Sequence, residues 1–119
     1  MTVAAVIGYI RSGQLRALGV TTVKRIDLLP DLPTINEFLP GYEAIAWGGI
    51  GAPANTPREI IATLNKEVNA ALDDASLKAR LADLGAEPFA SSSTEFGKFI
   101  VDETEKWAKV IRTAGIKAE

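Results

Sequence analysis

The sequence predicts an α/β fold whose helices pack on an incomplete sheet, one that another chain completes. Four segments have helical periodicity or helix caps, but only residues 15–22 and 42–52 have the character of buried strands. Pro30, Pro33 and Pro40 lie between these strands and leave no room for a long helix there. A two-stranded sheet is marginal and cannot cover four apolar helix faces. The 119 residues are therefore expected to be part of a larger molecule, or a protomer that needs a second copy.

The first third of the chain is expected to contain one helix, one strand and a loop. Residues 3–12 form a short apolar helix, and Gly13 ends it in the left-handed conformation. Residues 15–22 are a nearly continuous apolar run, which suits a strand buried on both faces of a parallel sheet. Residues 23–29 then form a polar loop, and residues 35–39 have room for one helical turn.

Three further helices are expected after residue 52. Pro57 occupies the first position of a helix that runs to about Asp73. Ser76 caps a shorter helix that stops at Gly85, and a capping box at residues 92–95 starts the last helix, which ends at Gly115. The inner face of this last helix is expected to carry large apolar residues, with the tryptophan in the core: Phe96, Phe99, Ile100, Trp107, Val110 and Ile111.

Composition excludes several functions. The chain has no cysteine and no histidine, so thiolate chemistry, cysteine-based zinc sites and histidine general bases are excluded. We therefore expect no enzyme, no cofactor and no metal. A net charge of −2 without a basic cluster argues against nucleic acid as a partner. The apolar start lacks a basic region before it, so we expect no signal peptide in this chain.

Several short motifs follow one another in a characteristic order. They are Gly13–Thr22, Lys24-Arg25, Leu29–Thr34, Leu39–Ala44, Trp47-Gly48, Ala52-Pro53, Thr56–Ile60, Leu64-Asn65, Leu84–Pro88 and the tail from Lys106 to Glu119. Together they resemble the C-terminal portion of the substrate-binding receptors of tripartite tricarboxylate transporters, the TctC or Bug family. No single motif is diagnostic, but the series covers essentially the whole chain.

The resemblance implies a periplasmic, two-lobed, type II periplasmic-binding-protein-like fold that closes on a small carboxylate or related solute. It also implies the membrane permease subunits of the transporter as partners. Residues 1–42 would be a remnant of the second lobe with its crossover loop. Residues 43–119 would supply the hinge strand and the C-terminal helices of the first lobe. The family's N-terminal part, with its signal peptide, is expected to be missing, so the chain would be a truncated receptor.

Four residues are candidate solute ligands. Thr21 and Thr22 end the first predicted strand, where open α/β sheets bind ligands, and their hydroxyl and amide groups suit a carboxylate. An equally good interpretation is that they merely begin the next loop. Tyr42 and Trp47 flank the hinge strand and could wall a cleft, although a core position is the commoner one for Trp47.

Two functions remain open from the sequence. The first is a non-catalytic, truncated receptor for carboxylate solutes. The alternative is a ligand-free α/β interaction module that forms a homodimer by completing its sheet. The mass in solution and a screen with organic acids would separate them.

Overall fold

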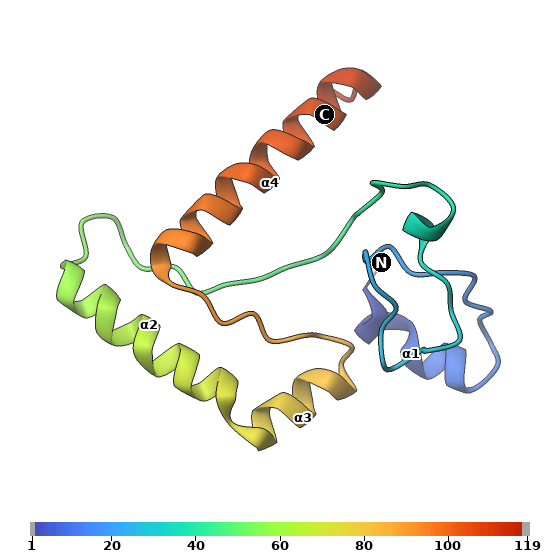
Figure 1. Ribbon diagram of the computed structural model, residues 1–119, viewed down its shortest axis with the longest axis horizontal. Helices are drawn as coiled ribbons and strands as arrows, with labels where there is room; N and C mark the ends of the chain where they lie inside the picture. Colours follow the sequence, from blue (N-terminus) through green and yellow to red (C-terminus); the bar gives the residue numbers. More distant parts are fainter. Residues whose placement is uncertain (1, 118–119) are drawn as a thin grey trace. The chain divides into compact units, whose positions relative to one another are not determined.

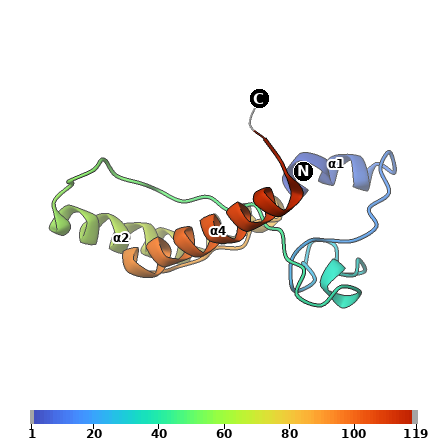
Figure 2. The same ribbon diagram turned by 90° about the horizontal axis from the view of Figure 1, so that it is seen from above.

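The computed structural model describes residues 2–117, which form four α-helices and one short 3₁₀ helix (Figures 1 and 2). In chain order these are α1 (Val3–Arg11), η1 (Ile35–Glu37), α2 (Arg58–Asp73), α3 (Ala75–Asp83) and α4 (Ser93–Ala114). The chain divides into two compact units. The first contains the chain up to Gly51 together with Leu72–Pro88, and the second contains Ala52–Ala71 and the chain from Phe89 onward. The lobe boundary expected at residues 42/43 falls inside the first unit, and the assignment to lobes stays a prediction.

In the first unit, α1 and α3 end at glycines with left-handed backbones. Gly13 has a φ of +75° and Gly85 a φ of +68°. After α3, the N–H of Gly85 donates to the carbonyl of Ala82 at 2.8 Å, and the N–H of Ala86 donates to that of Leu81 at 2.9 Å. This pair of bonds is the Schellman motif, which favours glycine because other residues are strained there. The predicted stops at Gly13 and Gly85 are confirmed.

Gly85 also lies directly against α1. A Cβ atom at this position would be 2.8 Å from Cγ1 of Val3 and 3.4 Å from Cδ2 of Leu28. The absence of a side chain therefore lets the end of α3 approach α1 and the loop that contains Leu28. Here glycine is needed for both its conformation and its size.

Neither predicted strand forms a ladder. Within residues 2–117, the only strand pairing is one isolated parallel bridge between Val20 and Thr34. The Val20 N–H donates to Pro33 at 3.0 Å, and the Ile35 N–H donates to Val20 at 2.9 Å. Residues 15–22 and 42–52 otherwise have no neighbouring strand, and the chain bends at residues 21 and 22, so the prediction of two buried strands was wrong. A ladder needs successive partners on an adjacent strand, and the segment with Pro33 supplies only one.

One helix start, that of α4, has the predicted capping box. At α4, the Ser92 hydroxyl accepts from the Glu95 N–H at 3.2 Å, and the Glu95 carboxylate accepts from the Ser92 N–H at 2.8 Å. This is the predicted capping box, and α2 begins at Arg58 directly after the predicted proline. Ser76 is not the cap of α3: the Asp74 carboxylate accepts from the Leu77 N–H at 2.9 Å instead. Aspartate is as good a cap as serine, and it lies before the helix begins.

In the second unit, two asparagines of α2 hold the segment that precedes α4. Nδ2 of Asn65 and Nδ2 of Asn69 both donate to the carbonyl of Ser91, at 2.9 and 3.0 Å. The Ser91 N–H in turn donates to Oδ1 of Asn69 at 3.4 Å. Both backbone groups of Ser91 are therefore satisfied by side chains of α2, which fixes where α4 starts.

The apolar face of α4 is largely open. Among residues 2–117 only Val20, Thr34 and Glu103 are buried. Trp107 is 39% exposed, so its predicted core position is wrong. Its indole N–H donates to the Glu103 carboxylate, one turn earlier on the same helix, at 3.1 Å. The ring therefore follows the surface of its own helix. No helix within residues 2–117 is both long and apolar enough to span a bilayer.

Candidate functional site

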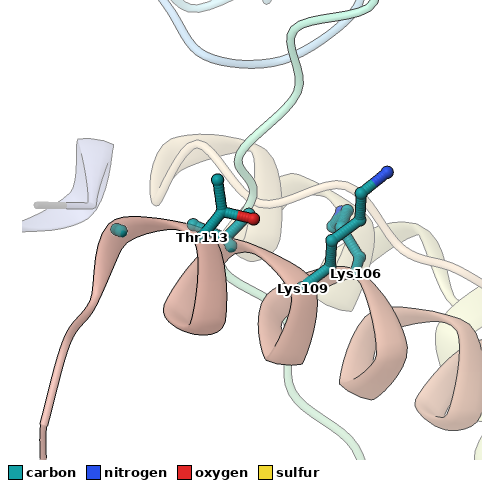
Figure 3. A pocket seen from close by; sticks show the side chains of 5 residues that line it. Lys106, Lys109 and Thr113 are labelled. Atoms are coloured by element: carbon teal, nitrogen blue, oxygen red, sulfur yellow. The ribbon is translucent and has the colours of Figure 1, made fainter.

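An open hollow lies along the last turns of α4 (Figure 3). Lys106, Lys109 and Thr113 line it from successive turns, together with Val110 and Ala114. Lys106 is paired with Glu103, so one of the two lysine charges in the hollow is already neutralised. No group of three or more potential metal ligands occurs in the chain between residues 2 and 117. None of the predicted ligand residues lies in this hollow, and its open, mostly apolar lining selects no particular ligand.

The predicted site at Thr21 and Thr22 is a bend that follows the isolated bridge. The Thr22 hydroxyl donates to the carbonyl of Lys24 at 2.6 Å and so holds the bend closed. Thr21 is exposed, and its hydroxyl forms no hydrogen bond within the described part of the chain. The two threonines therefore differ: Thr22 shapes the backbone, whereas Thr21 presents a donor to solvent.

Backbone donors accompany the Thr21 hydroxyl. Within residues 2–117, the N–H groups of Thr21, Thr22 and Val23 have no hydrogen-bond partner. Unpaired donors at the surface are satisfied by water, which a carboxylate can replace with charge-assisted hydrogen bonds. The bend thus concentrates the kind of donors that recognise an acid.

The structure connects this bend to the second predicted segment. The Ala44 N–H donates to the carbonyl of Thr21 at 3.0 Å, which places residues 42–47 beside the bend in the first unit. Tyr42 is 36% exposed and Trp47 is 44% exposed, so Trp47 is not a core residue. The link between the two segments is a backbone contact. That the four side chains bind a solute stays a prediction.

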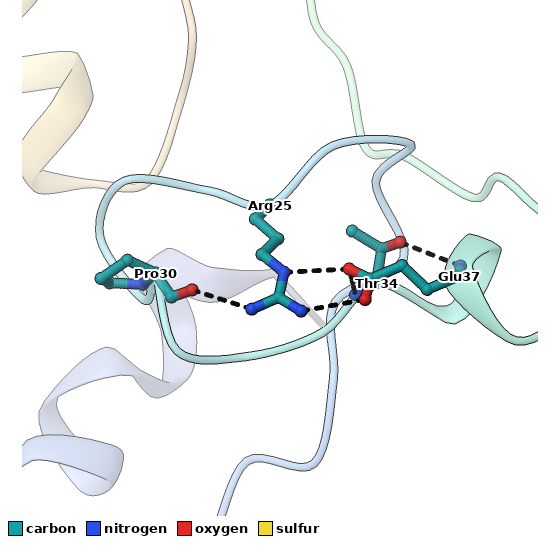
Figure 4. A network of polar contacts seen from close by, with 4 residues as sticks. All are labelled: Arg25, Pro30, Thr34 and Glu37. Atoms are coloured by element: carbon teal, nitrogen blue, oxygen red, sulfur yellow. Dashed lines mark hydrogen bonds and ion pairs between the residues drawn. The ribbon is translucent and has the colours of Figure 1, made fainter.

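A network of charged and polar groups lies next to the bend (Figure 4). Nε and Nη2 of Arg25 donate to the two carboxylate oxygens of Glu37, each at 2.9 Å, and Nη1 donates to the carbonyl of Pro30 at 3.4 Å. Glu37 also accepts from the Thr34 N–H at 3.0 Å, and the Thr34 hydroxyl accepts from the Glu37 N–H at 3.2 Å. Thr34 is 1% exposed. We call these three residues, Arg25, Thr34 and Glu37, the clasp.

The clasp strongly favours the ionised form of Glu37. The hydrogen bonds from the Arg25 guanidinium, followed by the bond from the Thr34 N–H, lower the pKa of Glu37 from 4.5 to about 2. The same carboxylate raises the pKa of Arg25. Both groups therefore stay charged at any physiological pH.

Sequence reasoning missed the clasp. Thr34 and Glu37 have the three-residue spacing of a capping box, and the structure confirms that they form one at the start of η1. That spacing could have been found in the sequence. The contact between Arg25 and Glu37 could not have been found in the sequence. Arg25 lies outside the capping box, and the shape of the intervening loop brings it to Glu37.

The family of the chain follows from comparison with known proteins. The family model described as "Tripartite tricarboxylate transporter family receptor" matches residues 1–116. Protein BugT of Bordetella pertussis is 37% identical over 114 residues, which cover 95% of this chain and 35% of BugT. A UPF0065 protein from the tcbD-tcbE intergenic region of Pseudomonas sp. strain P51 is 38% identical over 100 residues, or 82% of this chain and 30% of that protein. The chain thus spans about a third of the length of these curated relatives.

Several solved structures match the fold, and two of them show the likeness to this chain. R. palustris Rpa4515 with adipate superposes with a TM-score of 0.84 at 40% identity, over 95% of this chain and 38% of that one. The periplasmic binding protein BugD gives a TM-score of 0.83 at 32% identity, over 96% of this chain and 39% of BugD. The described helices and their single bridge are therefore part of a periplasmic-binding-protein fold of the α/β class. On the family match and these relatives together, the chain belongs to the tripartite tricarboxylate transporter receptor family.

Proposed function

We propose that this chain contributes part of the solute site of an extracytoplasmic, non-catalytic receptor for small carboxylates. The observation that carries the proposal is the exposed bend at Thr21, with a free hydroxyl and three backbone N–H groups without partners in the described chain. A solved relative with 40% identity is described with adipate, which is a dicarboxylate. Binding such an acid requires hydrogen-bond donors but no proton transfer, and so fits a chain without histidine or cysteine.

The four candidate residues have distinct roles in this proposal. The Thr21 hydroxyl and the neighbouring N–H groups bind one carboxylate. Thr22 keeps the bend closed through its bond to the carbonyl of Lys24. Tyr42 and Trp47, which are both partly exposed, flank the Ala44 contact and provide apolar surface for the methylene groups of the solute.

Membership of the family supports a cellular setting for this proposal. BugD is described as a periplasmic binding protein, and the family model is that of a transporter receptor. We therefore place the function of this chain in the periplasm, where the receptor delivers its solute to the membrane permease subunits of a tripartite tricarboxylate transporter.

Titration of the chain with adipate tests the proposal. We expect millimolar or tighter binding by calorimetry, and amide chemical-shift changes centred on residues 21–23. Thr21→Val removes a hydrogen bond to a charged group and should weaken binding about 10-fold or more. Thr63→Val is the matched control, because the Thr63 hydroxyl donates to Glu59 on α2 in the other unit. Unchanged affinity of the Thr21 variant would remove Thr21 from the site, and a wild-type chain that binds no dicarboxylate would refute the function.

The exposed face of α4 favours a second function, self-association. Trp107, Val110 and Ile111 are 39%, 44% and 45% exposed, which leaves a row of apolar side chains along one helix. Homodimerisation of the chain would cover this row. Sedimentation at about 100 µM, a concentration at which even micromolar association is visible, tests this. A monomer would refute the dimer.

A further inference from the structure

Arg25 is the obvious candidate to bind an acidic solute, since it follows the Thr21 bend by only a few residues. Its guanidinium is already occupied, however. Two of its nitrogens bond both oxygens of Glu37 at 2.9 Å, and a third reaches the Pro30 carbonyl at 3.4 Å. The N–H donors with which a guanidinium makes a two-bond contact are occupied by Glu37, so Arg25 cannot bind a second carboxylate in the same way.

The contacts of Glu37 lead away from solvent and towards the bridge. One of its oxygens accepts from the N–H of Thr34, and the Thr34 hydroxyl accepts from the N–H of Glu37. Thr34 is the most buried side chain in the described residues, at 1% exposure. Glu37, one member of the exposed ion pair, therefore forms two hydrogen bonds with the buried Thr34.

Thr34 in turn holds the strand end that leads into the bend. The carbonyl before Thr34 accepts from the Val20 N–H, and the N–H after Thr34 donates to the Val20 carbonyl. Gly19 permits this close approach, because a Cβ there would be 3.1 Å from the Pro33 carbonyl oxygen. Thr21 follows Val20 directly, and its carbonyl accepts from Ala44. A continuous series of bonds thus joins Arg25 to the bend.

From this series we infer that Arg25 and Glu37 are positioning residues for solute binding: the clasp fixes the Thr21 bend, and Arg25 does not itself bind the solute. The inference rests on the proposed function. Arg25 and Glu37 have side chains that are 49% and 39% exposed, and exposed ion pairs contribute little to overall stability. Their effect is local, because they close the loop that returns from the bend to Thr34.

Arg25→Lys is the decisive variant. Lysine keeps the positive charge but cannot make the two-pronged contact with Glu37. If the clasp positions the bend, the variant should weaken adipate binding about fivefold or more, the effect of one lost or misplaced hydrogen bond. The amide protons of Ile35 and Ala44, which form the bonds on either side of the bend, should exchange with solvent faster. Asp73→Asn is the matched control, because it breaks an exposed 2.9 Å pair with Lys78 in the same unit and should change neither quantity.

A double variant separates positioning from general destabilisation. In a Thr21→Val background, Arg25→Lys should weaken adipate binding less than it does in the wild type, because the Thr21 hydroxyl, one of the donors that the clasp positions, has already been removed. The inference would be overturned if Arg25→Lys lowered the affinity for adipate equally in the wild-type and Thr21→Val backgrounds. Unchanged affinity of the Arg25→Lys variant would overturn it as well. If the wild-type chain binds no adipate, the proposed function fails, and amide exchange alone then decides about the clasp. Unchanged exchange of Ile35 and Ala44 in Arg25→Lys would overturn it in that case too.

Discussion

Replacing Gly85 by alanine is expected to destabilise the chain by about 2–5 kcal/mol, the sum of two separate penalties. At a φ of +68°, a residue with a Cβ costs about 1–2 kcal/mol in the left-handed region. The new methyl would also lie 2.8 Å from Cγ1 and 3.0 Å from Cβ of Val3, and such overpacking adds about 1–3 kcal/mol. Valine is stiff about χ1, so relief requires a shift of α1 rather than a rotation of the side chain.

Gly13→Ala provides the comparison that isolates the contact. Gly13 also ends a helix of the first unit, with a φ of +75°, but a methyl group at this position would have no atom within 4 Å beyond its two chain neighbours. The substitution should therefore cost only the conformational penalty of about 1–2 kcal/mol. Urea denaturation followed by circular dichroism gives both values from the midpoint and the slope.

The difference between the two glycine variants tests the reasoning directly. If Gly85→Ala costs no more than Gly13→Ala within about 0.5 kcal/mol, the close contact with α1 is refuted. In a Val3→Ala background the difference should shrink, because the branched methyl that collides with the new Cβ has been removed. A difference that stays the same in this background would place the cause elsewhere.

Three further outcomes are expected. The carboxyl carbon signal of Glu37 should titrate with a pKa of about 2, and a midpoint at pH 4.5 would contradict the clasp. Because this pKa lies below its ordinary value of 4.5, the stabilisation from Glu37 is fully present above about pH 4.5 and is lost as the pH falls towards 2. Asn69→Ala removes the two bonds from Asn69 to Ser91, although the Ser91 carbonyl keeps its bond from Asn65, and should lower the free energy of unfolding by about 1–2 kcal/mol. An unchanged urea midpoint would show that the Asn69 bonds contribute nothing. Trp107→Ala should cost about 1–2 kcal/mol, below the 3–5 typical of a buried tryptophan, because the ring is 39% exposed; a loss above 3 in urea denaturation would mean that it is covered.

The helix ends were predictable because each is fixed by residues close in sequence. Gly13, Gly85 and Gly115 all have positive φ, as their positions after apolar stripes suggest. The Ser92–Glu95 capping box formed as predicted, since its two bonds join residues only three apart. Where two neighbouring residues could act as the cap, as at α3, the same local rules chose the wrong one.

The strands and the core were not predictable in the same way. Whether residues 15–22 form a strand depends on which distant segment lies beside them, and the structure supplies only the Thr34 bridge. Trp107 has the periodicity of a core residue, but periodicity indicates which face of a helix is apolar and not whether anything covers it. For the candidate site, the sequence singled out Thr21 and Thr22 as the end of a strand, where the structure has a bend, and it did not indicate the Arg25 contact with Glu37.

The glycine turns that end three of the helices also bear on the order in which the chain folds during synthesis. After α1 and α4, as after α3, the closing bonds join residues at most six apart, such as Gln14 to Tyr9 and Ile116 to Ile111. Each helix can therefore form and stop soon after its last residue leaves the ribosome, on the sub-microsecond to microsecond scale of helix formation. The Val20 bridge must wait for Thr34 to emerge, so the Thr21 bend takes its shape later than the helix that precedes it.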